Sequence, residues 1–349
     1  MELLSVTMND GVKPRSEIEG KDNSSEDKSN YKIVRKGDMV YNSMRMWQGA
    51  NGISPCDGIV SPAYTVLMPK QEINNGYFAA LFKSTKLINE FRKNSQGMTS
   101  DTWNLKYPQI ETIKVQIPSV SEQDKVSALF SVLDARIVAQ AQLVESLKKY
   151  KRGLLMHFFS DETTRQWRQY TISQIGKVIT GSTPPTNDRS NYDGDLMFCS
   201  PGDIGEQKYI SSTEKRVSPK GFALGRPIPP SSVIVTCIGL IGKLGIATSD
   251  MITNQQINAL IVSGDFDHEF IYYAFENFFP KYRSKVSMQT LPILSKSEFE
   301  RLLIKVPNLN VQRKISNYLA GMDKRIEQTQ QELNMLQELR RGIIQKLFI

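Results

Sequence analysis

The side chains that most often perform catalysis are few in this chain and widely scattered. It has two histidines, His157 and His268, and three cysteines, Cys56, Cys199 and Cys237. Neither histidine has a Cys or His neighbour at the spacing of a zinc site. An odd number of scattered cysteines argues against a disulfide framework and fits a reducing compartment. We therefore expect neither a catalytic triad nor a metal site.

Two loops imitate nucleotide-handling motifs but lack their key residues. In GLIGKLG (239–245), Cys237 stands where a phosphate-binding loop needs its first glycine, and Leu244 where it needs Ser or Thr. A tight turn after a strand explains this loop better. The segment TPPTND (183–188) lacks the leading Asn and the trailing aromatic residue of the NPPY-type motif of amino-methyltransferases. The sequence predicts a non-catalytic protein with no catalytic residue and no cofactor of its own.

The distribution of charge suggests a polyanionic partner. The net charge is +8 and the pI about 9.2. Residues 81–115 hold six bases and three acids, and residues 280–305 hold six bases and two acids, whereas residues 1–30 hold seven acids and four bases. A solvated basic surface is an equally good interpretation of either basic segment taken alone.

Residues 118–159 and 307–348 are two copies of one unit, 189 positions apart and aligned without a gap. The duplication makes the chain two-fold in its construction. The positions that match include Pro118/Pro307, Gln123/Gln312, Asp134/Asp323, Arg136/Arg325, Leu147/Leu336, Gly153/Gly342 and Phe159/Phe348.

Both copies carry apolar residues at alternating steps of four and three, which is typical of an amphipathic helix that packs on another helix. These apolar residues form a stripe along one face of each helix. Polar residues interrupt the two stripes at equivalent positions, Gln140 and Lys151 in the first copy and Thr329 and Arg340 in the second. The side chains expected to pack between the helices are Phe130, Leu133, Ile137, Gln140, Val144 and Leu147 of the first copy and Leu319, Met322, Ile326, Thr329, Leu333 and Leu336 of the second.

Each helix has a start signal and is unusually long. Ser121, with Asp124 three positions on, and Asn310 are candidate caps. About 37 residues at ~1.5 Å each span roughly 55 Å. Because an isolated helix would expose its stripe, we expect the copies to pack antiparallel, with Gln140 near Thr329. Two unrelated coiled-coil segments facing different partners are the alternative.

The remaining sequence indicates two related α/β domains. GDMVYNSMR (37–45) aligns loosely with SSVIVTCIG (231–239), and GYFAALFKSTKLINEF (76–91) with EFIYYAFENFFPKY (269–282). The first domain has no counterpart to residues 167–194, which we interpret as an N-terminal shortening. The predicted fold is mixed α/β (α+β) and pseudo-two-fold, with a first domain at 1–120, a helix at 121–159, a linker and second domain at 160–309, and a helix at 310–349.

This order of domains and helices resembles the specificity subunit of bacterial type I restriction-modification systems. Several segments of the chain are similar to sequences of that family: NYKIVRKGDMVYN, MWQGANGIS, DGIVSPAYTVL and WRQYTISQIGKVITGSTP. The most specific parts are the helix openings IPSVSEQDKVSALFSVLDARI and VPNLNVQRKISNYLAGMDKRI. The resemblance covers almost the whole chain, and the missing start of the first domain is its one departure.

The resemblance implies a cytoplasmic, non-catalytic DNA-binding subunit. Each domain, a target-recognition domain, would read one half of an asymmetric site in double-stranded DNA. The helices would fix the spacing of the halves and dock two methyltransferase subunits, which endonuclease/translocase subunits would then join. S-adenosylmethionine, ATP and Mg²⁺ would be bound by those partners.

No membrane partner is expected, because the longest apolar run, Val233–Gly242, is too short to cross a bilayer. A scaffold or adaptor that binds no DNA and is built on the duplicated coiled coil is the alternative function. Salt-dependent retention on DNA would distinguish the two, since only a DNA reader releases counterions.

Candidates for DNA contact are polar and basic residues in loops punctuated by glycine, because such side chains bond to base edges and phosphates. For any one of them a solvated loop side chain is an equally good interpretation, and Trp47 and Trp103 are expected to pack rather than stack on bases. The candidates are Arg45, Gln48, Asn51, Arg92, Lys93, Gln96 and Thr99 in the first domain and Ser182, Thr183, Arg189, Lys243, Gln255, Gln256, Arg283, Lys285 and Gln289 in the second.

Overall fold

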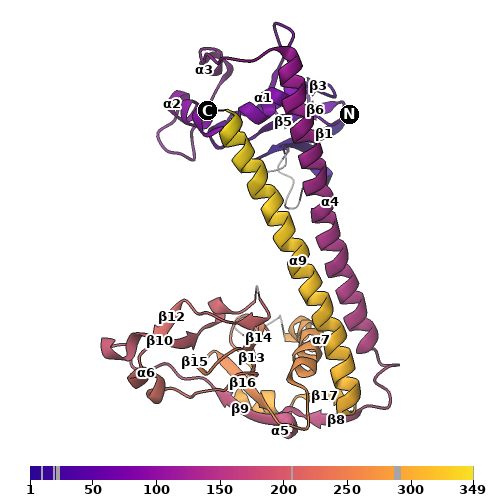
Figure 1. Ribbon diagram of the computed structural model, residues 1–349, viewed down its shortest axis with the longest axis vertical. Helices are drawn as coiled ribbons and strands as arrows, with labels where there is room; N and C mark the ends of the chain where they lie inside the picture. Colours follow the sequence, from indigo (N-terminus) through magenta and orange to yellow (C-terminus); the bar gives the residue numbers. More distant parts are fainter. Residues whose placement is uncertain (9–10, 19, 21–23, 206, 287–291, 349) are drawn as a thin grey trace. The chain divides into compact units, whose positions relative to one another are not determined.

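The structure is a computed structural model that describes residues 1–349 except 9–10, 19, 21–23, 206, 287–291 and 349. The chain divides into two compact units, Met1–Val144 with Thr329–Ile349, and Glu145–Gln328. Each unit contains one globular domain and a segment of both long helices, α4 (Val120–Phe158) and α9 (Leu309–Leu347), as Figure 1 shows.

The first domain is built on two small sheets. A four-stranded sheet has the order β2-β1-β6-β3, and a three-stranded sheet has the order β5-β4-β7. The strands are β1 (Glu2–Thr7), β2 (Gly11–Pro14), β3 (Lys32–Val34), β4 (Met39–Asn42), β5 (Asn51–Ile53), β6 (Gly58–Val60) and β7 (Tyr64–Leu67).

The helices of the first domain join it to the long helices. They are α1 (Asn75–Leu81), α2 (Thr85–Asn94) and α3 (Tyr107–Ile110), with short 3₁₀ turns η1 (Arg15–Glu17) and η2 (Met46–Gln48). One core combines Tyr77 and Leu81 of α1 and Phe91 of α2 with Phe130 of α4 and Phe348 at the end of α9. The domain therefore shares its core with both long helices.

The second domain has a five-stranded sheet of order β11-β14-β13-β16-β9, a three-stranded sheet of order β12-β10-β15, and the pair β17-β8. Its strands are β8 (Arg168–Thr171), β9 (Gly176–Thr180), β10 (Tyr192–Cys199), β11 (Tyr209–Ile210), β12 (Lys215–Val217), β13 (Val233–Thr236), β14 (Leu244–Ala247), β15 (Met251–Thr253), β16 (Ile257–Val262) and β17 (Leu303–Val306). Its helices are α5 (Ile172–Ile175), η3 (Arg189–Asn191), η4 (Pro201–Asp203), α6 (Pro219–Leu224), α7 (His268–Val286) and α8 (Lys296–Arg301).

The central strand of this sheet is buried on both faces. Side chains alternate along a strand, so Val233 and Val235 join the core made with α7, while Ile234 joins a separate core on the opposite face. The α7 core also contains Leu155 of α4 and Leu319 of α9. The second domain is thus also fastened to both long helices.

The two domains share a three-stranded motif, and the second domain adds a further strand to it. β4 pairs antiparallel with β5 and β7, as β13 pairs with β14 and β16. In the second domain β9 is added beside β16. Because β9 lies within residues 167–194, the segment without a counterpart in the first domain supplies this extra strand.

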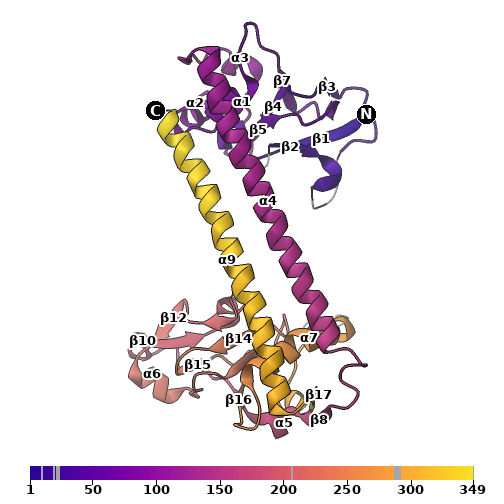
Figure 2. The same ribbon diagram turned by 45° about the vertical axis from the view of Figure 1, so that its right-hand side comes forward.

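The long helices lie side by side and run in opposite directions in both ribbon views (Figures 1 and 2). Going forward along α4, the contacted residues go backward along α9: Asp134 meets Arg340, and Lys151 meets Asp323. This confirms the predicted α/β fold with a long antiparallel helix pair.

The predicted helix starts were wrong by about two residues. Glu122 N donates to Ser119 Oγ at 3.4 Å, and Ser119 N donates to the Glu122 carboxylate at 3.1 Å, so Ser119 rather than Ser121 caps α4. Asn308 rather than Asn310 caps α9, accepting from Val311 N at 3.1 Å. The caps directly follow Pro118 and Pro307, after which the backbone first turns helical.

Candidate nucleic-acid interface and helix pair

The two candidate segments of the first domain, residues 43–52 and 91–104, meet on one surface. Trp47 contacts Trp103 edge to face, with ring centroids 5.1 Å apart. The Arg92 guanidinium carbon lies 5.7 Å from the centroid of the Trp47 ring. The tryptophans therefore pack together, as expected. The exposed or half-buried candidates on these segments are Arg45, Gln48, Arg92, Lys93, Gln96 and Thr99.

Asn51 does not belong to that surface. Its side chain is fully buried, and Nδ2 donates to the Gly49 carbonyl oxygen at 3.1 Å. Here the asparagine supports the turn that leads into β5. Thr99, by contrast, lies in a loop closed by two backbone hydrogen bonds between Gln96 and Asn104, 3.0 and 2.8 Å long.

In the second domain the sheet brings several candidates to one edge. Thr180 at the end of β9 is paired with Asn258, and Thr236 at the end of β13 with Ile257 at the start of β16. Loops leave the sheet at this common edge. They carry the candidates Ser182, Thr183, Lys243, Gln255 and Gln256, and Thr183 Oγ1 donates to Gln255 Oε1 at 2.7 Å.

A cleft of about 910 Å³ in the second domain includes Lys243 and one further candidate, Arg283, in its walls. The rest of its lining comes mainly from residues 202–205, 209–214 and 242–244 and from α7. Lys243 Nζ lies 3.5 Å from the Pro201 carbonyl oxygen, which places the lysine across the mouth of the 201–205 turn. We call this the α7 cleft.

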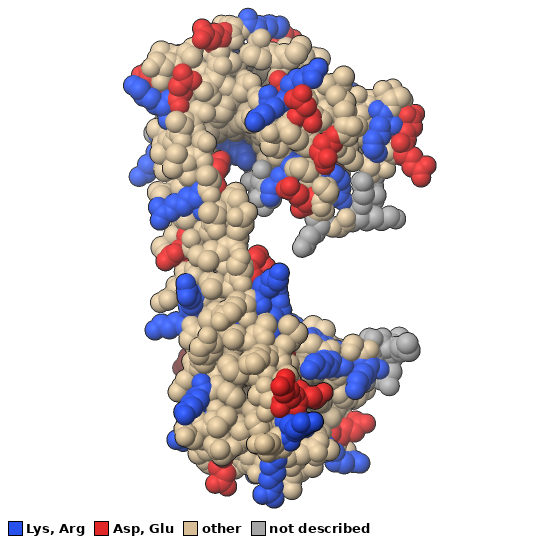
Figure 3. Space-filling model, turned by 90° about the vertical axis from the view of Figure 1, so that its right-hand side faces the viewer, with Lys and Arg blue, Asp and Glu red and all other residues tan. Residues whose placement is uncertain are grey.

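Three candidates of the second domain stand apart from these loops or lie outside the described structure. Arg189 lies in η3, next to the three-stranded sheet, and is exposed. Lys285 is exposed in the last turn of α7. Gln289 lies outside the described residues. In Figure 3, the Lys and Arg side chains on the face shown are interspersed with Asp and Glu, so charge alone does not mark a path for DNA on that face.

The expected helix-pair residues all lie in the interior or at its margin. Buried ones are Phe130, Leu133, Val144, Leu147, Leu319, Met322, Thr329 and Leu333, and half-buried ones are Ile137, Gln140, Ile326 and Leu336. Toward the helix ends the buried face turns from the other helix to the globular domain. Leu347 is 48% exposed, whereas Ile344 and Phe348 are buried against the first domain.

The polar residues that interrupt the two stripes form contacts across the helix pair. Gln140 Nε2 donates to the Thr329 carbonyl oxygen at 3.1 Å. Arg340 binds both carboxylate oxygens of Asp134, with Nη2 donating to Oδ2 at 3.1 Å. Lys151 pairs with Asp323, Nζ to Oδ1, at 2.7 Å.

These two ion pairs are one contact made twice. Asp323 occupies the position of Asp134 in the second copy, and Arg340 the position of Lys151. The sequence showed the interruptions and the duplicated aspartates, but not that they pair. An antiparallel packing of duplicated helices explains it, because each contact then has an equivalent on the other side of the centre.

The domains are fastened to the helices by a second duplicated contact. In the first unit, buried Gln123 accepts from Asn74 N at 2.9 Å and donates to the Pro118 carbonyl oxygen at 3.0 Å. Asn74 caps α1 by accepting from Tyr77 N. Gln123 of α4 therefore holds the first turn of a domain helix.

The same arrangement recurs in the second unit. Buried Gln312 accepts from Asp267 N at 2.9 Å and donates to the Pro307 carbonyl oxygen at 2.8 Å. Asp267 caps α7, accepting from Phe270 N at 2.8 Å. An aromatic pair accompanies each: Phe348 lies 5.3 Å from Tyr77, and the equivalent Phe159 lies 5.5 Å from Phe270, between ring centroids.

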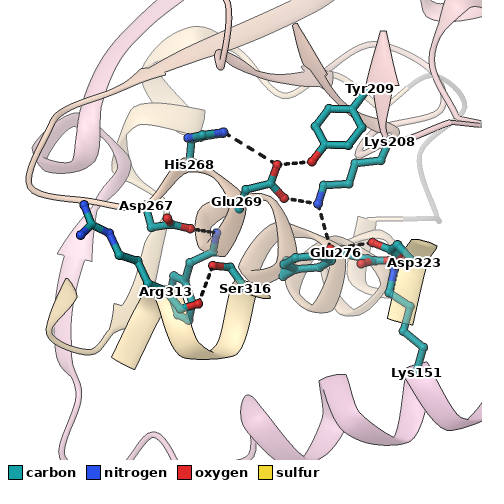
Figure 4. Close-up of polar contacts among 12 residues, drawn as sticks. Lys151, Lys208, Tyr209, Asp267, His268, Glu269, Glu276, Arg313, Ser316 and Asp323 are labelled. Carbon is teal, nitrogen blue, oxygen red and sulfur yellow. Dashed lines mark hydrogen bonds and ion pairs between the residues drawn. The ribbon is translucent and has the colours of Figure 1, made fainter. Parts of the chain in front are cut away.

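The second unit also contains a group of half-buried charges around α7 (Figure 4). The side chain of Lys151 is 12% exposed and reaches Glu276 of α7 at 2.9 Å as well as Asp323. Burial alone would lower the pKa of Lys151, but the carboxylates of Glu276 and Asp323 raise it above its usual value. Burial raises the pKa of Glu276, against the opposing effect of Lys151. Sequence spacing gives no sign of this group.

Among the described residues, no group of three or more His, Cys, Asp and Glu side chains could hold a metal ion.

A family model described as the type I restriction modification DNA specificity domain matches residues 5–149 and 164–338. The chain belongs to this family. The specificity subunit of the type I restriction enzyme HindI from Haemophilus influenzae is 21% identical over 319 residues, covering 69% of this chain and 70% of the relative. The MjaVIII specificity subunit from Methanocaldococcus jannaschii is 23% identical over 349 residues, covering 90% and 79%.

Solved structures of the family share the fold of this specificity subunit. The type I S subunit from M. genitalium has a TM-score of 0.60 at 17% identity, covering 91% of this chain and 84% of that one. A structure that describes complex assembly and conformational transition of a type I system has a TM-score of 0.61 at 19% identity, covering 93% and 84%.

Family membership confirms two predictions. The chain is a type I DNA specificity subunit with target-recognition domains, and such subunits are not catalytic. The DNA-binding roles of the individual loop residues remain predictions.

Proposed function

We propose that the two recognition domains each read one half of an asymmetric site in double-stranded DNA, while the helix pair sets the spacing between the halves. The main support is that the two domains are attached to the long helices by equivalent contacts. Gln123 of α4 and Gln312 of α9 each accept a hydrogen bond from the residue that caps a domain helix and donate one to the proline before their own helix. Two readers attached alike to antiparallel copies of one helix suit a site of two half-sites.

We infer that the exposed apolar residues of the helix pair dock two methyltransferase subunits. Leu129, Val132, Leu143 and Tyr150 of α4 and Tyr318, Met335 and Leu339 of α9 are all more than 40% exposed. The pairs Leu129/Tyr318 and Tyr150/Leu339 are equivalent in the two copies. One binding face for each copy fits two identical partners.

The composition of α4 fits the same role. Among the described residues it is the one helix long and apolar enough to cross a membrane by length and composition. Only 11% of its most apolar stretch is buried. Since the other side of α4 packs on α9, a protein partner covering the exposed apolar side accounts for this composition without a membrane.

In this proposal the chemistry resides in the partner subunits. S-adenosylmethionine serves the methyltransferase subunits, and ATP and Mg²⁺ serve the endonuclease/translocase subunits, in the cytoplasm. The specificity subunit contributes recognition, spacing and assembly.

The test is to co-express the chain with its cognate methyltransferase subunits and to map methylated adenines across the host genome. A split, asymmetric motif with one fixed spacing supports the proposal. A continuous motif, or methylation independent of this chain, contradicts it.

A further inference from the structure

We propose that Tyr273 is a positioning residue for DNA reading by the second domain, because its hydroxyl group joins the helix pair to the wall of the α7 cleft. The inference rests on the proposed function. It assigns to Tyr273 the control of base discrimination in the half-site that the second domain reads. Tyr273 is on α7 and fully buried.

The Tyr273 hydroxyl group lies between two charges of opposite sign. It donates to Asp323 Oδ2 at 2.6 Å and accepts from Lys208 Nζ at 2.8 Å. The Lys208 ammonium also lies 4.4 Å from the centroid of the Tyr273 ring. Burial, followed by the negative charge of Asp323, raises the pKa of Tyr273 far above its usual value, so the phenol keeps its proton and donates.

From Asp323 the contacts continue into the helix pair. Asp323 belongs to α9 and pairs with Lys151 of α4 at 2.7 Å. Lys151 Nζ in turn lies 2.9 Å from Glu276 Oε1. Glu276 belongs to α7, the helix that also carries Tyr273. Both long helices are therefore linked to the face of α7 that carries Tyr273.

From Lys208 the contacts continue to the cleft. Lys208 forms an ion pair with Glu269, which accepts from the Tyr209 hydroxyl at 2.6 Å (Figure 4). The Lys208 carbonyl oxygen also accepts from Ile246 N of β14 at 2.8 Å. Tyr209 lines the α7 cleft together with the DNA candidates Lys243 and Arg283.

This connection constrains orientation more tightly than apolar packing does. Hydrogen bonds weaken steeply when their angle departs from linear, and charges in a low-dielectric interior are costly to separate. Removing the Tyr273 hydroxyl group leaves Lys208 and Asp323 without their shared partner. The cleft wall can then shift relative to the helices while the apolar core, which is less directional, stays intact.

The residues that make this connection are replaced by other types in the first domain. When the caps Asn74 and Asp267 are aligned, the positions of Glu269, Tyr273 and Glu276 are taken by Gly76, Ala80 and Lys83. A defect in the network should therefore affect only one of the two half-sites.

The experiment compares Tyr273→Phe with Tyr170→Phe in the assembled methyltransferase. Tyr170 of β8 is half-buried against the core of the same domain, but it neither lines the cleft nor belongs to the chain of hydrogen bonds. Methylation rates are measured on duplexes that carry single base changes in either half-site. Tyr273→Phe should reduce discrimination in one half-site on the order of tenfold, whereas Tyr170→Phe should leave both unchanged.

A second variant covers the case in which Tyr273→Phe does not assemble. Tyr209 is 47% exposed, so Tyr209→Phe should fold, and it removes the last hydroxyl group of the network. It should relax the same half-site by a smaller factor. Relaxation of both half-sites alike, or no relaxation by either variant, overturns the inference. A wild-type complex without a split motif would instead contradict the proposed function.

Discussion

Gln140 of α4 donates a hydrogen bond to the backbone carbonyl oxygen of Thr329 of α9 at 3.1 Å, and the two residues occupy the same position in the two copies of the helix. A helix position that meets its own duplicate marks the centre of an antiparallel pair. On either side lie the ion pairs Asp134–Arg340 and Asp323–Lys151. Polar contacts thus stand at the centre and at two equivalent outer positions.

The two ion pairs should differ in their contribution to stability. Lys151→Met removes the cation that pairs with both Asp323 and Glu276 in a largely buried site, which should cost about 3 kcal/mol. Arg340→Met should cost about 1 kcal/mol, because Asp134 is 48% exposed and water screens the charge. Urea unfolding of the purified subunit measures both. Equal losses would mean that burial does not govern these pairs.

A slide of the helices by one heptad should be disfavoured by the ion pairs. The positions one heptad from Asp134 hold Ser127 and Ala141, and those from Asp323 hold Ser316 and Gln330. Neither long helix would then present a carboxylate to Arg340 or Lys151 at these positions. We expect the exchange Asp134→Arg with Arg340→Asp to recover most of the stability lost in either single variant, as a double-mutant cycle would show.

Gln123→Ala and Gln312→Ala should each loosen only the domain that the glutamine holds. Each change removes two hydrogen bonds to backbone groups and should cost about 2 kcal/mol. Hydrogen exchange should accelerate in the first turn of α1 for Gln123→Ala and of α7 for Gln312→Ala. Each variant is the control for the other, and faster exchange in both helices from one substitution would contradict a local role.

Val132→Asp should weaken methyltransferase binding without unfolding the subunit. Val132 is 72% exposed on α4, so an aspartate there is solvated in the free subunit and buried only when a partner covers it. Ser131→Asp, at the neighbouring exposed position, is the matched control. Co-purification of methyltransferase subunits should fall at least tenfold for Val132→Asp alone, roughly the effect of 1.4 kcal/mol. Equal recovery in both variants would exclude this face from docking.

The three cysteines should differ in reactivity. Burial raises the pKa of Cys199 to about 12 and that of Cys237 to about 11, so both remain protonated thiols at neutral pH. Cys56 is only half-buried. Because the thiolate is the reactive form, iodoacetamide at pH 8 should alkylate Cys56 first.

The raised pKa values also predict a pH dependence of stability. The unfolded chain releases its thiol protons above about pH 9, while the folded chain retains them, so these thiols should destabilise the fold as pH rises from there toward 11 and 12.

Mass spectrometry of iodoacetamide-treated native and urea-unfolded protein gives the order in which the three cysteines are alkylated. Early labelling of Cys199 would contradict its burial.

The long helices could be predicted from the sequence because their apolar period repeats and their duplication is free of gaps. The interruptions Lys151 and Arg340 were visible, but not their partners, since pairing depends on the antiparallel register. Asn51 shows the limit for loops: its residue type suits base contacts, yet the turn at Gly49 places it inside the domain. The connection through Tyr273 unites positions 151, 208, 273 and 323, and no local pattern links residues so far apart in the chain.

The most direct test of the account is the methylated motif of a subunit with lengthened helices. Four residues are inserted at equivalent central positions, after Gln142 in α4 and after Gln331 in α9, and the genome-wide methylation of its complex is compared with wild type. Four residues add roughly 6 Å, or about one or two base-pair steps. We predict that both half-sites keep their bases while the spacer between them lengthens. An active complex that retains the original spacing would contradict the claim that the helix pair sets it.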